Sequence, residues 1–246
     1  MKRTSLCAAL AAATAAFPTA AHAGPDDYVH TPAVEYGERE VELRLGTATK
    51  SGEARQSAAA LALGYGPTPW WFTEVYAKFE RAGGEGTRFD AFEWENKFQL
   101  TEPGQYFVDL GLLVEIERPR DRAEGYELRL GPLLQKDVGP VQANFNVLIE
   151  RHYRAAEPQV TELGYQWQLK YRWRPELEFG AQGFGEVGQW NDWAPAHAQE
   201  HTLGPALFGK LHVAGRKVVR YDAALLFGAS SAAADRTLRA RIEYEF

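Results

Sequence analysis

Two histidines in a polar stretch carry the clearest hint of site chemistry in this sequence. His197 and His201 have the four-residue spacing that places two ligands on one face of a helix, and Asp192 and Glu200 add carboxylate oxygens. Pro195 argues against a helix here, and no third histidine is close in the sequence. The stretch therefore predicts either a weak zinc or copper site or a polar surface loop.

Nucleophilic catalysis would require a base within hydrogen-bond reach of a serine or threonine hydroxyl. His152 is a candidate base, but no serine neighbours it, and only the fold could bring Ser51 or Ser57 close. The glycine-rich residues 180–185 lack the strand–turn–helix context of a nucleotide site. We therefore predict a protein that is not an enzyme and holds no cofactor, with a lipid hydrolase as the remaining catalytic alternative.

The N-terminus has the three parts of an export signal. A short basic start at Lys2 and Arg3 precedes an alanine-rich apolar run over residues 6–17, and Ala21-His22-Ala23 forms a small-x-small cleavage site. We predict a signal peptide over residues 1–23. Its removal takes away Lys2 and Arg3 and no acid, which moves the net charge from −6 to −8. Cleavage also removes Cys7, the only cysteine, so disulfides and thiolate chemistry are excluded. The negative net charge argues against a nucleic-acid partner.

The elements that must position any site are strands, because the chain shows a period of two. Residues 238–246 place Leu, Ala, Ile, Tyr and Phe on one face and only Arg and Glu on the other, since side chains alternate along a strand. Comparable alternation recurs over residues 71–80, 90–100, 108–117, 163–173 and 219–228. These lengths match the roughly 9–11 residues that a tilted strand needs to cross a bilayer.

Weaker strands fill the remaining sequence and bring the total to about twelve. They cover residues 41–47, 57–65, 126–135, 141–151, 176–187 and 203–212. Tight Gly/Pro turns, such as residues 102–104, alternate with longer polar connections, which predicts short periplasmic turns and longer extracellular loops. We predict an all-β fold, a single antiparallel up-and-down transmembrane β-barrel over residues 37–246, preceded by a flexible periplasmic lead-in over residues 24–36.

The end of the chain and one internal stretch resemble known barrels. The amphipathic last strand, closing on Phe246, resembles the C-terminal signature of Gram-negative outer-membrane barrels, which implies contact with the barrel-assembly machinery and with outer-membrane lipid. Residues 130–139 and 144–150 resemble uncharacterised proteobacterial outer-membrane barrels of the MetA-pathway-of-phenol-degradation and copper-resistance type. That resemblance implies a barrel and brings no catalytic motif. The alternative is a soluble barrel whose apolar face covers a core.

If the apolar faces meet lipid, the opposite faces line the lumen. Acids concentrate on the predicted strands 90–100 and 108–117, and bases on those at 163–173 and 238–246. The candidate selectivity residues on these faces and on strand 219–228 are Glu93, Glu95, Lys97, Glu115, Glu117, Lys170, Arg172, Arg220, Arg239 and Arg241.

These lumen charges support two interpretations. In the first, an acidic wall faces a basic wall across a wet pore, and the field between them selects charged or zwitterionic solutes. In the second, the charges pair and fill a narrow barrel. The leading hypothesis is a porin-like outer-membrane channel for small solutes with a narrow lumen of mixed charge. A non-conducting structural barrel with partner-binding or metal-binding loops is the alternative, followed by an outer-membrane lipid hydrolase.

Overall fold

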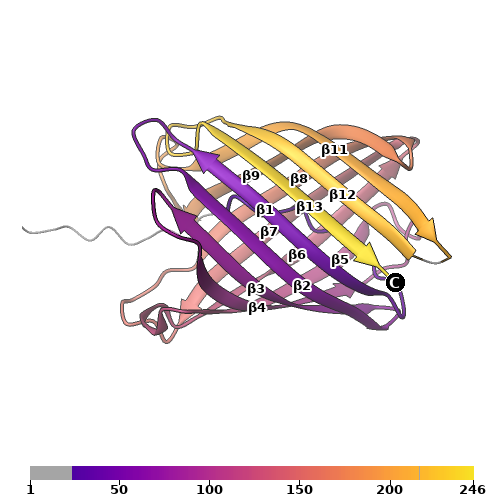
Figure 1. Cartoon of the computed structure of the whole chain (residues 1–246), viewed down its shortest axis with the longest axis horizontal. Coiled ribbons are helices and arrows are strands. Elements are labelled where there is room, and N and C mark those ends of the chain that lie inside the picture. Colours follow the sequence, from indigo (N-terminus) through magenta and orange to yellow (C-terminus); the bar gives the residue numbers. More distant parts are fainter. Residues whose placement is uncertain (1–23, 216) are drawn as a thin grey trace, which may run out of the picture.

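The computed structural model describes residues 24–215 and 217–246, so the predicted signal peptide lies outside the described residues. Within these ranges, twelve long antiparallel strands follow one another around a closed barrel (Figure 1). Their bounds are β1 Arg39–Thr49, β2 Gln56–Thr68, β3 Trp71–Ala82, β4 Arg88–Gln99, β5 Asp109–Pro119, β6 Tyr126–Val138, β7 Val141–Tyr153, β8 Glu162–Arg174, β9 Leu177–Gln189, β11 Glu200–Ala214, β12 Lys217–Gly228 and β13 Arg236–Glu245.

The barrel closes because the first strand pairs with both the second and the last. Leu43 on β1 lies opposite Leu61 on β2 and opposite Ile242 on β13. Every other strand pairs with its neighbours in the chain, except that β9 pairs with β11 beyond the two-residue strand β10 (Asp192–Trp193). Closure leaves none of the twelve long strands with an unpaired edge. The predicted up-and-down barrel of twelve strands is therefore confirmed.

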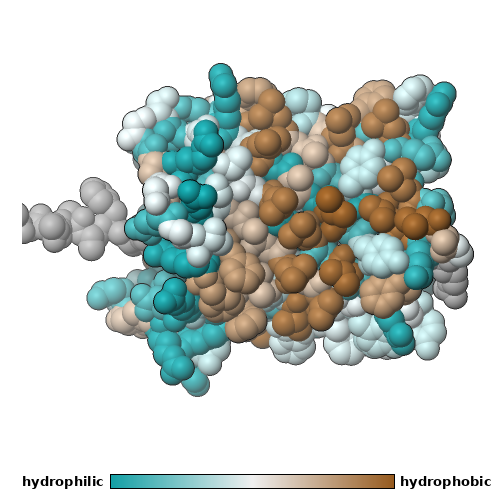
Figure 2. All heavy atoms as spheres, viewed as in Figure 1, coloured by the Kyte–Doolittle hydropathy of each residue, from teal (hydrophilic) through white to brown (hydrophobic). Residues whose placement is uncertain are grey.

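The two faces of each strand differ as the period of two predicts. On β2, Leu63 is 66% exposed on the outside, whereas Glu42 on the neighbouring β1 points inward and is 1% exposed. Figure 2 shows apolar side chains spread over the outer face of the strands and polar ones gathered at one end. An apolar outer belt around a polar interior is the arrangement of a barrel that sits in lipid.

The connections separate the two ends of the barrel. At one end, tight turns after β2, β6, β8 and β11 join the strands, and the C-terminal Phe246 lies at the same end. The turn after β6 uses Gly139 at a positive φ of 57°, a conformation that glycine adopts without strain. The other end carries longer connections, including the short 3-10 helix η1 (Arg122–Glu124). Because short turns face the periplasm in such barrels, the end with the longer connections is extracellular.

One of the predicted tight turns is longer than expected. The structure places residues 100–108 between β4 and β5, where the sequence predicts a turn at residues 102–104. The Asp109 carboxylate accepts a hydrogen bond from the Gly104 amide at 2.6 Å, and the Thr101 hydroxyl accepts one from the Leu110 amide at 2.8 Å. These side-chain contacts hold an ordered connection that the Gly/Pro pattern alone does not reveal. No helix within the described residues is long and apolar enough to cross a membrane.

Residues 24–36, hereafter the inner segment, enter the barrel, and Glu35 and Tyr36 at the end of the segment are exposed at the periplasmic end. The prediction of a flexible periplasmic lead-in is wrong for this part of the chain. Tyr28, Val29 and His30 are all at most 6% exposed, and the segment runs from the extracellular half of the lumen to the start of β1 at the periplasmic end. The prediction failed because the segment has no strand periodicity of its own and gains its order from contacts with distant strands.

Candidate functional site in the occupied lumen

Tyr28 anchors the inner segment in the middle of the lumen. Two guanidinium groups lie against its ring, with Arg44 Cζ 3.7 Å and Arg241 Cζ 4.6 Å from the ring centroid. Its hydroxyl donates to the Glu95 carboxylate at 3.1 Å. Arg44 in turn lies over the Tyr76 ring at 4.0 Å. Cation–π contacts strengthen when water is excluded, so this buried stack holds the segment firmly.

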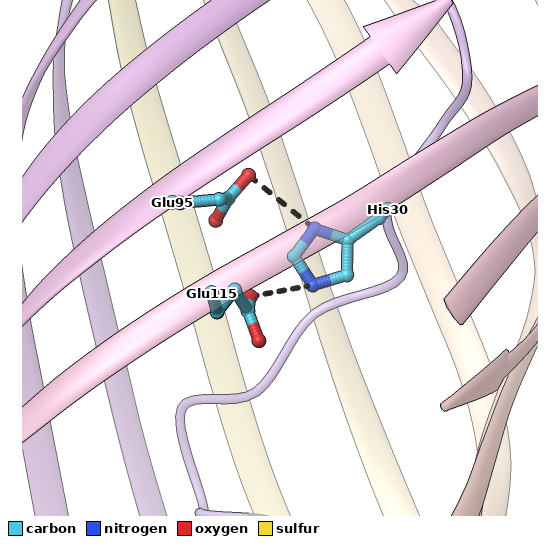
Figure 3. A group of neighbouring side chains, drawn as sticks. All are labelled: His30, Glu95 and Glu115. Carbon is cyan, nitrogen blue, oxygen red and sulfur yellow. Dashed lines mark ion pairs between the residues drawn. The ribbon is translucent and has the colours of Figure 1, made fainter. Parts of the chain in front are cut away.

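His30 lies between two carboxylates from neighbouring strands (Figure 3). Its Nδ1 is 3.5 Å from Glu95 Oε1 on β4, and its Nε2 is 3.4 Å from Glu115 Oε1 on β5. The three side chains are between 1% and 3% exposed. From β7 and β8, two and three strands further along the wall than β5, the Asn146 amide donates to the His30 carbonyl at 3.0 Å, and the His30 amide donates to Gln166 at 3.5 Å. The residue is thus fixed through its ring by β4 and β5 and through its backbone by β7 and β8.

Further polar contacts hold the segment on either side of this centre. Arg129 donates to the Asp27 carboxylate at 3.1 Å toward the extracellular end. The Val34 amide donates to Gln99 at 2.8 Å toward the periplasmic end. Because the segment is held along its length, it crosses the barrel as an ordered strap.

The barrel wall is shaped to admit this strap. A Cβ atom built on Gly46 would lie 2.0 Å from the Pro25 carbonyl oxygen, and one on Gly66 would lie 2.3 Å from that of Glu35. A Cβ on Gly111 would lie 2.8 Å from Pro32 Cβ. Only glycine permits such close approach of two chains. Three strands, β1, β2 and β5, therefore carry glycine at the places where the inner segment passes.

The inner segment stands between two cavities. The extracellular cavity, of about 430 Å³, is bordered by Asp26 and Asp27 of the segment and includes Glu127, Glu150 and His152 of the wall. The periplasmic cavity, of about 560 Å³, is bordered by Thr31, Ala33 and Glu35 of the segment, and its wall includes Lys97, Lys170, Arg172, Arg220 and Arg241. Each cavity is large enough for a small solute, and the buried residues from Tyr28 to His30 lie on the route between them.

The predicted acidic side chains point into the lumen, where each one meets a cation. Glu93 and Glu117 share the ammonium of Lys78, at 3.1 and 2.6 Å. Glu95 lies 3.3 Å from Arg44, and the second carboxylate oxygen of Glu115 lies 3.6 Å from Arg129. The acids on β4 and β5 are therefore compensated by bases on β3, β1 and β6 and by the inner segment.

The predicted basic side chains are also paired locally, apart from Lys97. Arg239 and Arg241 both contact Asp222, at 2.5 and 2.7 Å, and Arg241 also contacts Glu42 at 3.1 Å. The remaining contacts are Lys170 with Glu178 at 3.4 Å, Arg172 with Asp137 at 3.0 Å, and Arg220 with Glu243 at 3.2 Å and with Glu245. Lys97 lies over the Phe72 ring at 5.0 Å. The acidic and basic groups occupy the expected strands, yet all of them except Lys97 have a partner of opposite sign beside them.

A chain of neutral amides, which the sequence reasoning missed, lines the wall from β6 to β9. Asn144 donates to Gln135 at 3.0 Å, Gln168 donates to Asn144 at 3.2 Å, and Gln182 donates to Gln168 at 2.8 Å. Arg239 completes the series by donating to Gln182 at 2.5 Å. These residues occupy the inward positions of the same period-two pattern. They were overlooked because only charged side chains were weighed as lumen residues.

The loop histidines lie apart from the lumen centre. His201 contacts the Tyr165 hydroxyl through Nδ1 at 2.9 Å and Gln199 Oε1 through Nε2 at 3.0 Å. His197 is exposed, and its carbonyl accepts a hydrogen bond from Ser231. In the part of the chain that the structure describes, neither histidine belongs to a group of three potential metal ligands. A metal site at His197 and His201 stays a prediction.

The candidate base and the two serines have other partners. His152 Nδ1 lies 3.1 Å from the Glu124 carbonyl, and its Nε2 lies 3.4 Å from Glu127. Ser51 donates to Asp235 at 2.6 Å, and Ser57 donates to Thr47. The fold therefore gives these side chains structural contacts.

Comparison with known proteins supports the barrel and leaves the family open. No family model matches the chain, and no curated protein matches its sequence. Among solved structures, the NanC porin matches with a TM-score of 0.54 at 12% identity, covering 84% of this chain and 98% of that one. The COG4313 outer membrane channel from Pseudomonas putida F1 matches with a TM-score of 0.55 at 13% identity, covering 89% and 99%.

A third match widens the range of functions that share this architecture. The translocator domain of the autotransporter NalP from Neisseria meningitidis matches with a TM-score of 0.53 at 11% identity, covering 86% of this chain and 88% of that one. Since the identities are this low, the likeness concerns the fold. Together with the apolar outer belt, it identifies the chain as an outer-membrane β-barrel whose architecture resembles that of porins and channels.

Proposed function

We propose that this protein is a porin-like outer-membrane channel for small solutes and that the inner segment limits passage through it. The observation that carries the proposal is the pair of cavities, of about 430 and 560 Å³, that open from the two ends and are separated by residues 28–30. The inner segment stands between these two cavities. When it moves, the cavities join into one continuous lumen.

The contacts around the strap support a movable element. Most of them are polar, and two buried amide atoms beside His30, Asn146 Oδ1 and Gln166 Nε2, have no hydrogen-bond partner among the described residues. Each buried polar atom without a partner costs about 1–3 kcal/mol. The seated state is therefore less favourable than the number of its contacts suggests, and release would expose these groups to water or to a passing polar solute.

The mixed charge of the lumen supports small polar solutes as the cargo. Both cavities are lined by acids and bases, such as Glu127 and Arg129 on the extracellular side and Glu178 and Lys170 on the periplasmic side. A wall that presents both signs at close range suits zwitterions and small ions, whose two ends can be compensated at once. The size of the cavities restricts the cargo to small molecules.

Planar-bilayer recording of the purified barrel tests the proposal. We expect discrete single-channel openings with a small conductance, because the segment fills the middle of the lumen. A protein that is folded but passes no current under any applied voltage would contradict the channel and favour the non-conducting structural barrel. The density of ion pairs in the lumen is the observation that keeps this second candidate open.

We propose further that the C-terminal strand is the signal for assembly. Phe246 is 53% exposed at the periplasmic end, its ring stacks on Tyr244 at 5.9 Å, and its amide donates to the Arg39 carbonyl, which continues the β13–β1 pairing. Its exposure leaves the ring available to the barrel-assembly machinery and to lipid. Replacing Phe246 with alanine should lower the amount of assembled barrel in outer membranes, and unchanged amounts would contradict this role. The resemblance to barrels of the MetA-pathway and copper-resistance type stays a prediction.

A further inference from the structure

His30 lies beside two carboxylates of the barrel wall that repel each other. Glu95 on β4 and Glu115 on β5 are directly opposite each other in the register of the two strands, and both point into the lumen. Like charges in directly opposed cross-strand positions are destabilising. The His30 ring lies against this pair, with one nitrogen facing each carboxylate (Figure 3).

The protonation state of the ring decides how many of these carboxylates it can compensate. A neutral imidazole has one N–H and donates to one acceptor, whereas an imidazolium donates from both nitrogens and carries a positive charge. Because Nδ1 faces Glu95 and Nε2 faces Glu115, the arrangement matches the imidazolium. One ligand atom from each of the three side chains lies within 4.8 Å of the others, so a bound metal ion is the alternative that the zinc measurement tests.

Several other charged groups surround His30. Arg44 from β1 contacts Glu95, and Arg129 from β6 contacts both Glu115 and Asp27 of the inner segment. Glu93 on β4 is paired with Lys78. Tyr28 donates its hydroxyl to Glu95, and β7 and β8 present the neutral amides of Asn146 and Gln166. Imidazole ordinarily changes its charge between about pH 5 and 8. Burial lowers the pKa of His30, and the neighbouring Glu95 carboxylate opposes this shift.

We propose that His30 is a proton-operated latch for the inner segment. The imidazolium bridges Glu95 and Glu115 and keeps the segment seated across the lumen. Loss of the proton leaves one carboxylate without a donor from the ring and removes one positive charge from the centre, so the segment is released more often as the pH rises. Acid outside the cell would close the barrel. The latch rests on the proposed function, in which the inner segment limits passage.

Release of the segment can be measured without recording current. Ala33 is an exposed residue of the inner segment on the periplasmic cavity, and Cys7 is the only cysteine of the chain and lies in the predicted signal peptide. A nitroxide attached to Ala33→Cys in the folded barrel reports the mobility of the segment by electron paramagnetic resonance. We expect the ratio of mobile to immobile label to rise between pH 5 and pH 8, by at most about tenfold per pH unit for one proton.

Three variants in the Ala33→Cys background decide the role of His30. His30→Gln has no charge to lose, so its label should show the same mobility at every pH. Glu115→Gln removes one of the two bridged carboxylates and should weaken the pH response. If His30→Gln does not fold, Glu115→Gln is the variant that tests the latch. His152→Gln is the matched control, because His152 also faces a glutamate, at 3.4 Å, but lies at the extracellular cavity, and it should keep the wild-type profile.

The outcomes separate the latch from the channel. A pH-dependent mobility that persists in His30→Gln overturns the latch, as does a flat profile in the labelled barrel with native His30. Immobilisation by Zn²⁺ at constant pH that requires His30, without any response to pH alone, would replace the proton with a metal ion and also overturn it. Label mobility is recorded without current, so it tests the latch independently of conductance. A conducting barrel whose label shows no pH response would support the channel and overturn the latch.

Discussion

The two halves of the lumen wall hold the inner segment by different means. The charged half, β1 with β4 to β6 and β13, binds the side chains of Asp27, Tyr28 and His30 through guanidinium and carboxylate groups. The amide half, β7 and β8, binds the backbone of His30 through Asn146 and Gln166. Contacts with backbone atoms are independent of sequence and pH, whereas contacts with charged side chains depend on both. The charged half therefore sets ion selectivity and the response to pH, and the amide half sets the position of the inner segment.

The largest effect should come from Arg44→Ala in the charged half. Arg44 contacts Glu42 and Glu95 and lies over the rings of Tyr28 and Tyr76, so its loss leaves two buried carboxylates short of a cation and removes one side of the Tyr28 stack. Breaking a buried ion pair on one side costs about 3–5 kcal/mol. Chemical unfolding in detergent or lipid should show a loss of stability in this range. A loss below about 1 kcal/mol would mean that the charged half does not hold the segment.

The next largest effect should come from a steric change that leaves all charges in place. Gly111→Val on β5 would force atoms into the space of Pro32. Overpacking costs about 1–3 kcal/mol, and here the movable partner is the inner segment and not the paired strands. We expect more frequent or larger openings in bilayer recordings with unchanged barrel assembly. Gly86→Val, in the connection between β3 and β4 with open space around it, tests whether a valine in place of glycine changes conductance without touching the segment.

Asn146→Ala tests the amide half. The variant loses the donor to the His30 carbonyl and leaves that buried oxygen without this partner, at a cost of about 1–3 kcal/mol. Unfolding should show a smaller loss than Arg44→Ala, and the mobility of a label on residue 33 should increase at every pH while its pH dependence remains. If the pH dependence disappeared with Asn146, the division between a charged and an amide half would be wrong.

The smallest expected change is in ion selectivity. Replacing Glu93, Glu95 and Glu117 together with glutamine removes three negative charges from the wall, which should shift the ratio of cation to anion permeability toward anions by a few-fold. Reversal potentials in a salt gradient measure this ratio. Gln168→Ala on the amide half should leave it unchanged, because no charge is altered. An unchanged ratio in the triple variant would exclude these acids from the conducting path.

The outer face of the barrel could be predicted from the sequence, and the occupied lumen could not. The outward placement of residues such as Leu43 and Ile242 follows from period-two alternation, because lipid selects every second residue along each strand. The inward residues share that period, so Glu95 and Arg239 were placed correctly inside. Which inward residues touch depends on the curvature and register of the closed barrel, and local patterns do not carry this information.

The inner segment was missed for a related reason. Its contacts join residues far apart in the chain, such as Asp27 with Arg129, and the segment has no alternation that would identify it as structured. Two signals were present in the sequence. Gly46 and Gly111 interrupt otherwise regular strands at inward positions, and Tyr28, Val29 and His30 are an unusual run for a solvent-exposed linker. Together they would have indicated a chain passing close to the wall.

The central claim, that the inner segment closes the lumen, is tested most directly by single-channel recording of a variant that lacks residues 24–34. Its matched control lacks residues 195–198 of an extracellular connection. We predict that the first deletion raises the conductance several-fold above that of the wild type, because the two cavities then join, and that the second leaves it unchanged. Equal conductance of wild type and the first variant, with both folded, would contradict the account.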